Sequence, residues 1–464
     1  MNYMFKTLRY FFLITSLILI GSCTTTETDS MTYFGGKIIN PKTDFVLLYN
    51  QDKLVDSLFL DKDDKFTGKY KDFKEDFYLF KHGDEFQHVY IQPQDSILIR
   101  LNTWYFDETL VFSGQGADKN NILIDWFLES EKENENKKIN RYFKLPPALF
   151  KSKMDSLLAL REQKIDRFKS RNESLPESYL NVLNIIVNYP IYKRLEAYPR
   201  RHRHYNQSKE FPKTGDSFYN YRDKIDLNID SLKYIGQYSS YIAYRLYNMV
   251  NVEGLSSSSD GYTESLLNTI DKIITNEKLK NIFLYEMLVK DFLARSSCGI
   301  DKKSFHNYFK LSSDIEDKKQ VQRIINDIKN LHGGEALMSF QITDYLKTKR
   351  SIKKITRNKN SVICFWTPKY TSKLRLKKRI SYFTSNFPEI NFILVKISDI
   401  HSDYVHGIDI KNQYYLEPSS EANLFLTSKL PRTLLVNKKG TIVNGYANIH
   451  SHLFNKQLKK LQKQ

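Results

Sequence analysis

The sequence predicts a multidomain α+β protein, because the spacing of apolar residues changes twice along its 464 residues. Short apolar runs between turns, typical of an antiparallel β-sandwich, fill residues 32–116. Apolar residues at steps of three and four, typical of helices, follow over residues 117–333. Buried strands alternate with helices over residues 334–464, which indicates an α/β domain. The sequence therefore predicts three folded regions.

Residues 1–22 have the parts of an export signal. A basic start without acids is followed by the apolar run Tyr10–Ile20 and then by small residues. The run is too short to span a membrane, which favours a cleaved signal. It resembles a bacterial lipoprotein signal, which implies that Cys23 becomes the lipid-bearing first residue; an unmodified thiol is the alternative. The polar residues 23–31 predict a tether with too little apolar surface to fold.

This signal predicts an exported protein, anchored in a membrane of the cell envelope through Cys23. The expected place is the outer membrane, facing the periplasm or the cell surface. Only Cys298 and Cys364 remain as other thiols, too few for a disulfide framework in a chain of this size.

Positive charge is concentrated in the C-terminal region. The chain carries a formal net charge of +18. Residues 334–464 hold 23 Lys or Arg against 8 Asp or Glu, a net of +15. A basic surface favours an acidic protein, peptide or glycan as partner, while a face that is merely solvated is the alternative. Export to the cell envelope argues against nucleic acid as a partner.

Residues 32–116 predict a small antiparallel sandwich of short strands. Four apolar runs between polar turns mark strands: Phe45–Tyr49, Leu54–Leu60, Phe77–Phe80 and Val89–Ile91. The alternation of Ile97, Ile99 and Leu101 marks a further strand. No catalytic constellation is present, so this region is predicted to be a binding or spacing module.

Residues 117–333 predict a helical region. Apolar stripes mark four helices, which begin near Phe150, Tyr179, Leu232 and Ile282. Pro190 predicts a kink or a break in the second helix. Stripes at this spacing are usually core, which favours a helical spacer over a helical ligand pocket. Arg200–His204 predicts a solvated basic loop, because three arginines beside two histidines oppose a metal ion.

Five potential metal ligands gather after a predicted strand near the C-terminus. They are Asp399, His401, Asp403, His406 and Asp409. Carboxylates and imidazoles bind divalent cations, but this spacing matches no regular metal motif, and exposed loops commonly collect such residues. We therefore expect no metal and no other cofactor.

The stretch Ser361–Lys373 organises the C-terminal region. An apolar run ending at Trp366 breaks at Thr367-Pro368 and leads into a basic amphipathic helix predicted over Thr371–Phe387, with Leu374 among its apolar positions. The elements predicted after it are a buried strand at Asn391–Ile397, a short helix at Ser420–Thr427, two strands around a Lys-Lys-Gly turn and a terminal helix at His450–Leu461. Together they make a βαβ…ββα pattern.

On these residues the region resembles an exported thioredoxin-like lipoprotein family of Bacteroidota, of the thiol–disulfide interchange type. The shared features are the Phe365-Trp366 pair, its spacing to the following turn, and Leu430-Pro431 before a strand and a glycine turn. Residues 34–41 also resemble the β-domain that precedes such modules. The resemblance implies a cis peptide bond at Pro431, facing a Cys-x-x-Cys pair; an ordinary trans proline is the alternative.

The cysteine pair of that family is missing, since Tyr370 and Lys373 occupy its two positions. Disulfide exchange needs a low-pKa thiolate and a resolving thiol, which a phenol and an ammonium cannot supply. Cys364 lies inside the predicted strand, where a buried thiol is inert. The degenerate active site therefore predicts no disulfide chemistry. The candidate binding face comprises Trp366, Lys369, Tyr370, Lys373 and Pro431.

Three functional hypotheses follow. The favoured one is a lipid-anchored envelope protein whose redox-inactive thioredoxin-like domain serves binding or assembly. The alternative is a thiol–disulfide oxidoreductase or related envelope enzyme that uses residues the sequence does not reveal. The third is capture of a glycan or a peptide by the β-sandwich.

Overall fold

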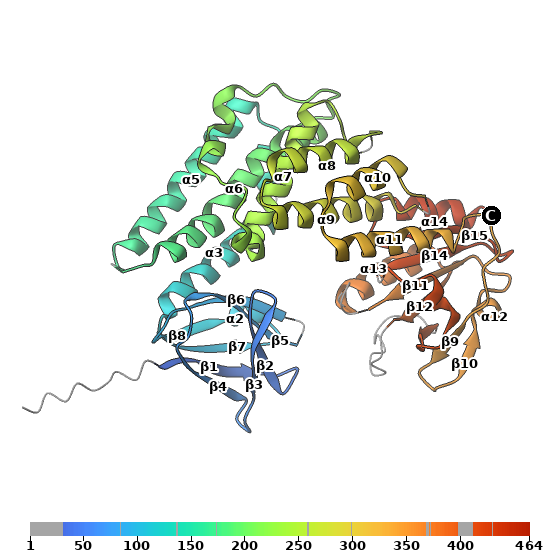
Figure 1. The fold of residues 1–464 in the computed structure, drawn as a ribbon, viewed down its shortest axis with the longest axis horizontal. Helices are drawn as coiled ribbons and strands as arrows, with labels where there is room; N and C mark the ends of the chain where they lie inside the picture. The colour runs from blue at the N-terminus through green and yellow to red at the C-terminus, as the bar shows by residue number, and fades with distance from the viewer. Residues whose placement is uncertain are drawn as a thin grey trace, which may run out of the picture. The chain divides into compact units, whose positions relative to one another are not determined.

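The computed structural model describes residues 31–464 except 84, 136–137, 173, 258, 298, 368–370, 372, 398–411 and 429. In this part the chain is a mixed α+β protein, as predicted (Figure 1). It forms two compact units: one comprises Met1–Ile139 and Ser174–Ile186, and the other comprises Asn140–Glu173 and Val187–Gln464. The division into three folded regions stays a prediction.

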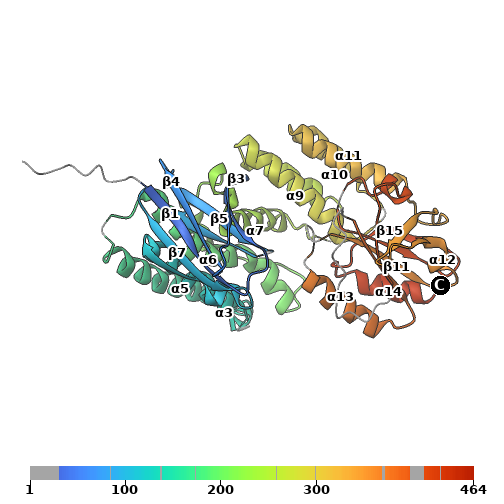
Figure 2. The same cartoon turned by 90° about the horizontal axis from the view of Figure 1, so that it is seen from below.

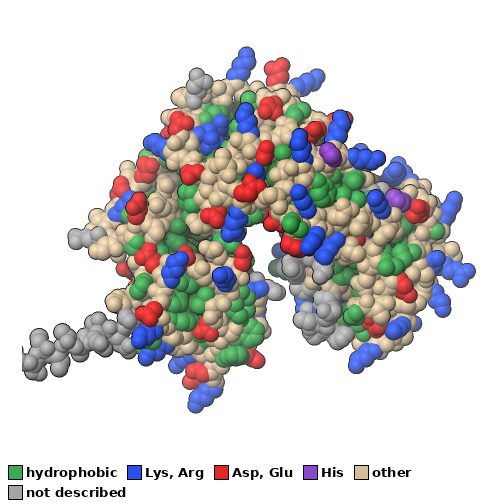
Figure 3. All heavy atoms as spheres, in the orientation of Figure 1, with side chains coloured by type: hydrophobic (Ala, Val, Ile, Leu, Met, Phe, Trp, Pro, Cys, Tyr) green, Lys and Arg blue, Asp and Glu red, His purple; other side chains and the backbone are tan. Residues whose placement is uncertain are grey.

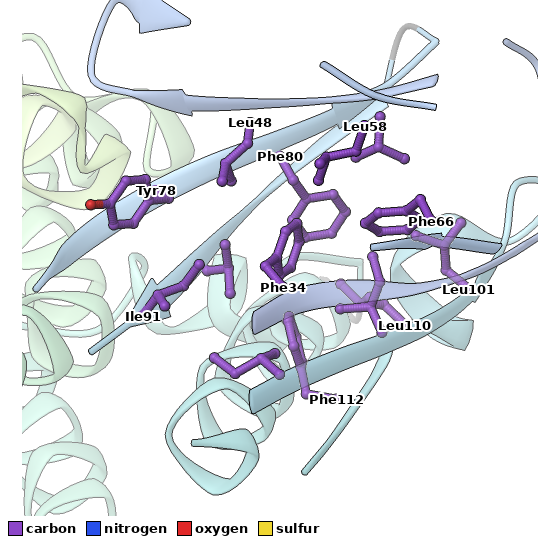
Figure 4. Close-up of a cluster of buried hydrophobic side chains, with 14 of the residues drawn as sticks. Phe34, Leu48, Leu58, Phe66, Tyr78, Phe80, Ile91, Leu101, Leu110 and Phe112 are labelled. Carbon is purple, nitrogen blue, oxygen red and sulfur yellow. The ribbon is translucent and has the colours of Figure 1, made fainter. Parts of the chain in front are cut away.

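Two four-stranded sheets form the β-sandwich of the first unit, in the orders β4-β1-β7-β8 and β3-β2-β5-β6. The strands are β1 (Met31–Ile39), β2 (Phe45–Asn50), β3 (Lys53–Phe59), β4 (Lys65–Lys71), β5 (Asp76–His82), β6 (Glu85–Ile91), β7 (Ser96–Asn102) and β8 (Val111–Gln115). Aromatic and aliphatic side chains from both sheets fill the space between them (Figure 4). Phe34 and Phe80, from different sheets, have ring centroids 5.8 Å apart.

The predicted antiparallel arrangement is wrong for one pair of strands. β1 and β7 run parallel, with Phe34 opposite Ile97. Between these two strands the chain passes through the second sheet, so no hairpin turn fixes the direction in which β7 returns. Helices α2 (Phe106–Thr109) and α3 (Ala117–Glu135) follow. The side chain of Asn120 on α3 accepts from the Tyr90 backbone N–H at 2.7 Å and donates to its carbonyl at 2.9 Å, which ties α3 to β6.

Helices dominate the middle of the chain. They are α4 (Lys138–Tyr142), α5 (Pro147–Lys169), α6 (Glu177–Tyr205), the 3₁₀ helices η1 (Asp216–Lys224) and η2 (Asp230–Tyr234), α7 (Gly236–Val252), α8 (Tyr262–Ile273), α9 (Glu277–Arg295), α10 (Lys302–Leu311) and α11 (Ile315–Lys329). Within the described residues, no helix is both long enough and apolar enough to span a bilayer.

The structure corrects two sequence predictions about α6. The helix continues through Pro190 and Pro199, which excludes the predicted break at Pro190, while the kink stays a prediction. Burial of Ile191 and Leu195, whose exposed fractions are 0%, offsets the hydrogen bond that a helix-interior proline removes. Arg200–His204 is not a loop but part of the last turns of α6, where cations interact favourably with the helix dipole.

The C-terminal region contains a seven-stranded sheet in the order β10-β9-β13-β12-β11-β14-β15. Its elements are β9 (Gln341–Asp344), β10 (Lys349–Ser351), α12 (Ile352–Thr356), β11 (Ser361–Trp366), α13 (Lys373–Asn386), β12 (Asn391–Lys396), β13 (Gln413–Tyr415), η3 (Glu421–Leu424), β14 (Arg432–Val436), β15 (Ile442–Ala447) and α14 (Phe454–Gln462). β11 is parallel to β12 and antiparallel to β14. The predicted βαβ…ββα succession is therefore present.

Side chains of β11 alternate between two hydrophobic cores, one on each face of this sheet. Val362, Cys364 and Trp366 pack with α13 and α14, which lie beside each other (Figure 2). Ile363 and Phe365 pack on the opposite face with residues of α12, η3 and the end of α11. All six residues of β11 are buried, as expected for a central strand covered on both faces.

Polar side chains of the C-terminal region satisfy the end of α9. Asn444 donates to the Ser296 carbonyl at 2.7 Å, and Gln457 donates to the same oxygen at 2.6 Å. Ser451 donates to the Ala294 carbonyl at 2.8 Å. The last carbonyls of a helix have no partner within that helix, so these bonds stabilise the attachment of α9 to the sheet.

Candidate functional site at the end of strand β11

The candidate binding face lies where β11 ends and α13 begins. Trp366 is the last residue of β11 and is only 2% exposed, so its ring is core and not surface. Lys373 is the first residue of α13. Pro431 immediately precedes β14, the antiparallel neighbour of β11. Lys369 and Tyr370 lie outside the described residues, as does Cys23.

The prediction of a cis peptide bond at Pro431 is wrong. No peptide bond in the part of the chain that the structure describes is cis, and both Leu430 and Pro431 belong to that part. The trans form is the intrinsically favoured one for an X–Pro bond. In this form Arg432, the next residue, pairs with Phe365 of β11.

Arg432 anchors β14 in a buried polar cluster that the sequence did not reveal. Its guanidinium donates to the carbonyls of Gly445 at 2.7 Å and Asp327 at 3.1 Å, and to that of Phe425. The Asp327 carboxylate on α11 lies 3.8 Å from the guanidinium and accepts from the backbone N–H groups of Thr427 and Ser428, both at 2.9 Å.

Both charged side chains of this Arg432 cluster are almost completely buried, with exposed fractions of 1% for Arg432 and 0% for Asp327. Burial lowers the pKa of Arg432 to about 10, against the opposing effects of Tyr446 and Asp327, so the guanidinium stays charged at neutral pH. A buried ion pair with its hydrogen bonds satisfied serves the structure. The backbone after Pro431 is therefore held rigidly against α11.

The described part of the chain contains one free thiol, that of Cys364, which is buried. Burial raises the pKa of this thiol to about 12, although a hydrogen bond with Thr433 acts in the opposite direction. Thr433 lies directly opposite Cys364 on β14. Because the thiolate is the reactive form, Cys364 is unsuited to disulfide exchange. Cys298 lies outside the described residues.

The α13 face consists of Lys373, Leu374, Arg375, Lys378 and Arg379. The helix itself contains no acidic residue. Leu374, predicted to be an apolar core position, is 63% exposed, because Leu376 and Ile380 occupy the buried side of the helix instead. In Figure 3, Lys and Arg side chains project over the C-terminal part of the chain, with Asp and Glu scattered among them. An exposed leucine among cations suits a partner with acidic and apolar groups.

His450 is a site residue that sequence analysis missed. Its ring nitrogen Nε2 lies 3.2 Å from the Thr371 hydroxyl, at the turn before α13. Burial and the positive charges of Arg375 and Arg379 lower the pKa of His450 to about 4, so the imidazole is neutral at neutral pH. Arg379 donates to the neighbouring Ile449 carbonyl at 2.7 Å.

The missed role of His450 has a physical reason. The sequence predicted that the terminal helix begins at His450, but α14 begins at Phe454. The side chain of Asn448 accepts from the His450 backbone N–H at 2.9 Å, and that of Ser451 accepts from the Leu453 N–H at 3.1 Å. These local bonds hold a turn that competes with helix and points His450 toward α13. The Asn-x-His-Ser pattern could have signalled this turn.

The candidate metal ligands Asp399, His401, Asp403, His406 and Asp409 all lie outside the described residues. Elsewhere, within the described residues, no group of three or more His, Cys, Asp or Glu side chains is placed to hold a metal ion. The helical region has a hollow of about 370 Å³ beside α8. In it Glu253 accepts from Ser265 at 2.8 Å, and Asn268, Thr269 and Lys272 also line it. Whether the helical region is a spacer or a ligand pocket stays open.

Comparison with known proteins gives a likeness to solved structures over 28% of the chain. No protein-family model and no curated protein matches the chain. Among solved structures, it is similar to the thioredoxin domain of a thiol-disulfide oxidoreductase from Bacteroides vulgatus, with 18% identity, a TM-score of 0.24 and coverage of 28% of this chain and 99% of that chain. A thiol:disulfide interchange protein from Bacteroides sp. has 18% identity, a TM-score of 0.23 and coverage of 28% and 91%. Both likenesses cover a minor part of the chain.

Proposed function

We propose that this chain is a lipid-anchored cell-envelope protein whose thioredoxin-like domain binds a partner and does not exchange disulfides. The observation that carries the absence of disulfide exchange is the burial of Cys364, because burial raises the pKa of its thiol to about 12. Tyr370 and Lys373 stand where the related family has its cysteine pair. Within the described residues no low-pKa thiolate is available as the nucleophile for the first step of disulfide exchange.

A disulfide-reductase assay tests the absence of exchange. We expect the purified chain to reduce insulin no faster than the reductant in the assay does by itself. The alternative, an envelope oxidoreductase that uses other residues, predicts turnover above this background. Turnover that persists in a Cys298→Ser/Cys364→Ser double variant would identify an enzyme that needs neither thiol.

The proposed partner is acidic and contacts the α13 face. Arg375 and Lys378 are exposed there, close to Leu374. A fluorescent polyglutamate peptide serves as the probe, measured by anisotropy. Reversing both charges with Arg375→Glu/Lys378→Glu is expected to weaken binding by about tenfold or more, since each exposed pair contributes up to about 1 kcal/mol. Raised salt concentration should weaken binding of the unaltered chain as well.

A matched control uses the other helix on the same face of the sheet. Lys459 and Lys460 are exposed on α14 and carry the same charge. Lys459→Glu/Lys460→Glu changes the net charge equally, so unchanged peptide binding by this variant assigns binding to the α13 face. Equal losses in the two double variants would mean that total charge, and not a site, attracts the peptide.

Anchoring through Cys23 is tested by lipid labelling in cells. We expect radiolabelled palmitate in the unaltered chain and none in a Cys23→Ser variant. In membrane fractionation, the unaltered chain should be found in the membrane fraction and the variant in the periplasmic fraction. Exposure of cells to protease decides whether the anchored protein faces the periplasm or the cell surface.

A further inference from the structure

Lys193, Arg200 and Arg201 lie in the C-terminal half of α6, and all three interact electrostatically with Tyr244 of α7. Arg200 and Arg201 follow Lys193 by seven and eight residues, about two turns, so all three project from one side of the helix. The Lys193 ammonium lies 5.4 Å from the centre of the Tyr244 ring. The Arg201 guanidinium lies 4.9 Å from the centre of the Phe143 ring. Two of the three cations, Lys193 and Arg201, thus lie over aromatic rings.

No carboxylate balances this charge. In the described part of the chain, Lys193, Arg200 and Arg201 form no ion pair within 4.0 Å. Other cations of the helical region do find acids: Arg222 is 2.5 Å from Glu196, and Arg295 is 2.6 Å from Asp291. The helix dipole favours cations in the last turn, but that effect does not extend to Lys193, about three turns earlier.

The uncompensated charge acts on the groups within the cluster. Burial would raise the pKa of Tyr244, but the charges of Arg201, Lys193 and Arg200 outweigh this effect and lower it. Burial lowers the pKa of Lys193, Tyr244 acts in the opposite direction, and Arg201 and Arg194 lower it further. The cations therefore stabilise the charged form of Tyr244 but repel one another, and a bound anion would relieve this repulsion.

We propose that Lys193, Arg200, Arg201 and Tyr244 form a binding site for a tetrahedral oxyanion, the chemistry that phosphate and sulfate share. Guanidinium groups supply paired N–H donors that match two oxygens of such an anion. The Lys193 ammonium adds a point charge, and the Tyr244 hydroxyl adds a donor. The anion belongs either to a free ion or to the head group of a membrane lipid, and the two sources are separable by experiment.

Calorimetric titration of the full chain with sodium phosphate, sodium sulfate and sodium acetate, at matched ionic strength, tests this site. We expect phosphate and sulfate to bind more tightly than acetate. Arg200→Gln and Arg201→Gln should each weaken phosphate binding by about tenfold or more, the effect of losing a charge-assisted hydrogen bond. Arg200 is exposed, so its replacement should leave the fold intact, which circular dichroism verifies.

Arg203→Gln is the matched control. Arg203 is on the same helix end but packs over the Phe211 ring at 4.1 Å, outside the cluster. Phosphate affinity unchanged in this variant supports the site; an equal loss in Arg203→Gln and Arg200→Gln overturns it, as does a complete lack of phosphate and sulfate binding. Phosphatidylcholine vesicles with and without phosphatidic acid then identify the source: a preference for phosphatidic acid that Arg200→Gln abolishes indicates a lipid head group, and no preference indicates a free ion.

Discussion

Two sets of cations lie on either side of strand β11, and they differ in what surrounds them. On the β14 side, Arg432 is buried against Asp327 with its donors satisfied. On the α13 side, Arg375 and Lys378 are exposed, and Arg379 donates to a backbone carbonyl, that of Ile449. A cation that is buried against a carboxylate therefore serves the structure, while a cation exposed on the surface can receive a ligand.

The largest effect is expected from a substitution in the buried Arg432 cluster. Arg432→Met leaves the Asp327 carboxylate buried without its cation, which should lower the free energy of unfolding by about 3–5 kcal/mol. Denaturant unfolding followed by circular dichroism measures this loss. The control is Arg350→Gln, which removes an exposed partner 3.2 Å from Asp344 and should cost at most about 1 kcal/mol. Equal losses in both variants would contradict the distinction.

A second, smaller effect concerns the thiol between the two sides. Cys364→Ser places a hydroxyl in the apolar core beneath α13, which should lower the free energy of unfolding by about 1–3 kcal/mol. In a Cys23→Ser/Cys298→Ser background, Cys364 should react with a thiol reagent only as fast as the chain unfolds. Rapid labelling of the folded chain would show that this thiol is accessible and would weaken the case against redox chemistry.

A third effect is a pH dependence at the turn before α13. The pKa of His450 falls from its ordinary 6.5 to about 4 in the folded chain, so folding favours the neutral imidazole. The stability that this preference provides is complete above pH 6.5 and is lost as the pH falls toward 4. His450→Gln should therefore lose less stability than the unaltered chain across this range. The exposed His452→Gln serves as control, and identical pH profiles for all three proteins would rule out the effect.

The fold of the C-terminal region was predictable because its signals are local. Ser361–Trp366 is an unbroken apolar run that must be buried on both faces, and the strand lies there. Strand β4 was not predicted, since Gly68 stands at the inward position between Phe66 and Tyr70 and interrupts the apolar alternation. The parallel pairing of β1 with β7 was also out of reach, because strand direction depends on contacts far apart in sequence.

The site was only partly predictable for the same reason. Lys373 is where the sequence places it, at the start of α13. His450 joins that turn from 79 residues farther along the chain, through a contact that no local pattern encodes. The Arg432 cluster likewise pairs a strand with a helix 105 residues earlier. Spacing in sequence identifies motifs, but tertiary contacts decide which charged residues serve the fold.

We propose that the C-terminal region lacks disulfide chemistry because Tyr370 and Lys373 stand at the two positions of the cysteine pair. The most direct test compares insulin reduction by the unaltered chain with that by a Tyr370→Cys/Lys373→Cys variant, which restores the cysteine pair on the same scaffold. We expect the unaltered chain to reduce insulin at the background rate and the variant to reduce it clearly faster. Equal turnover by both proteins above background would contradict this proposal.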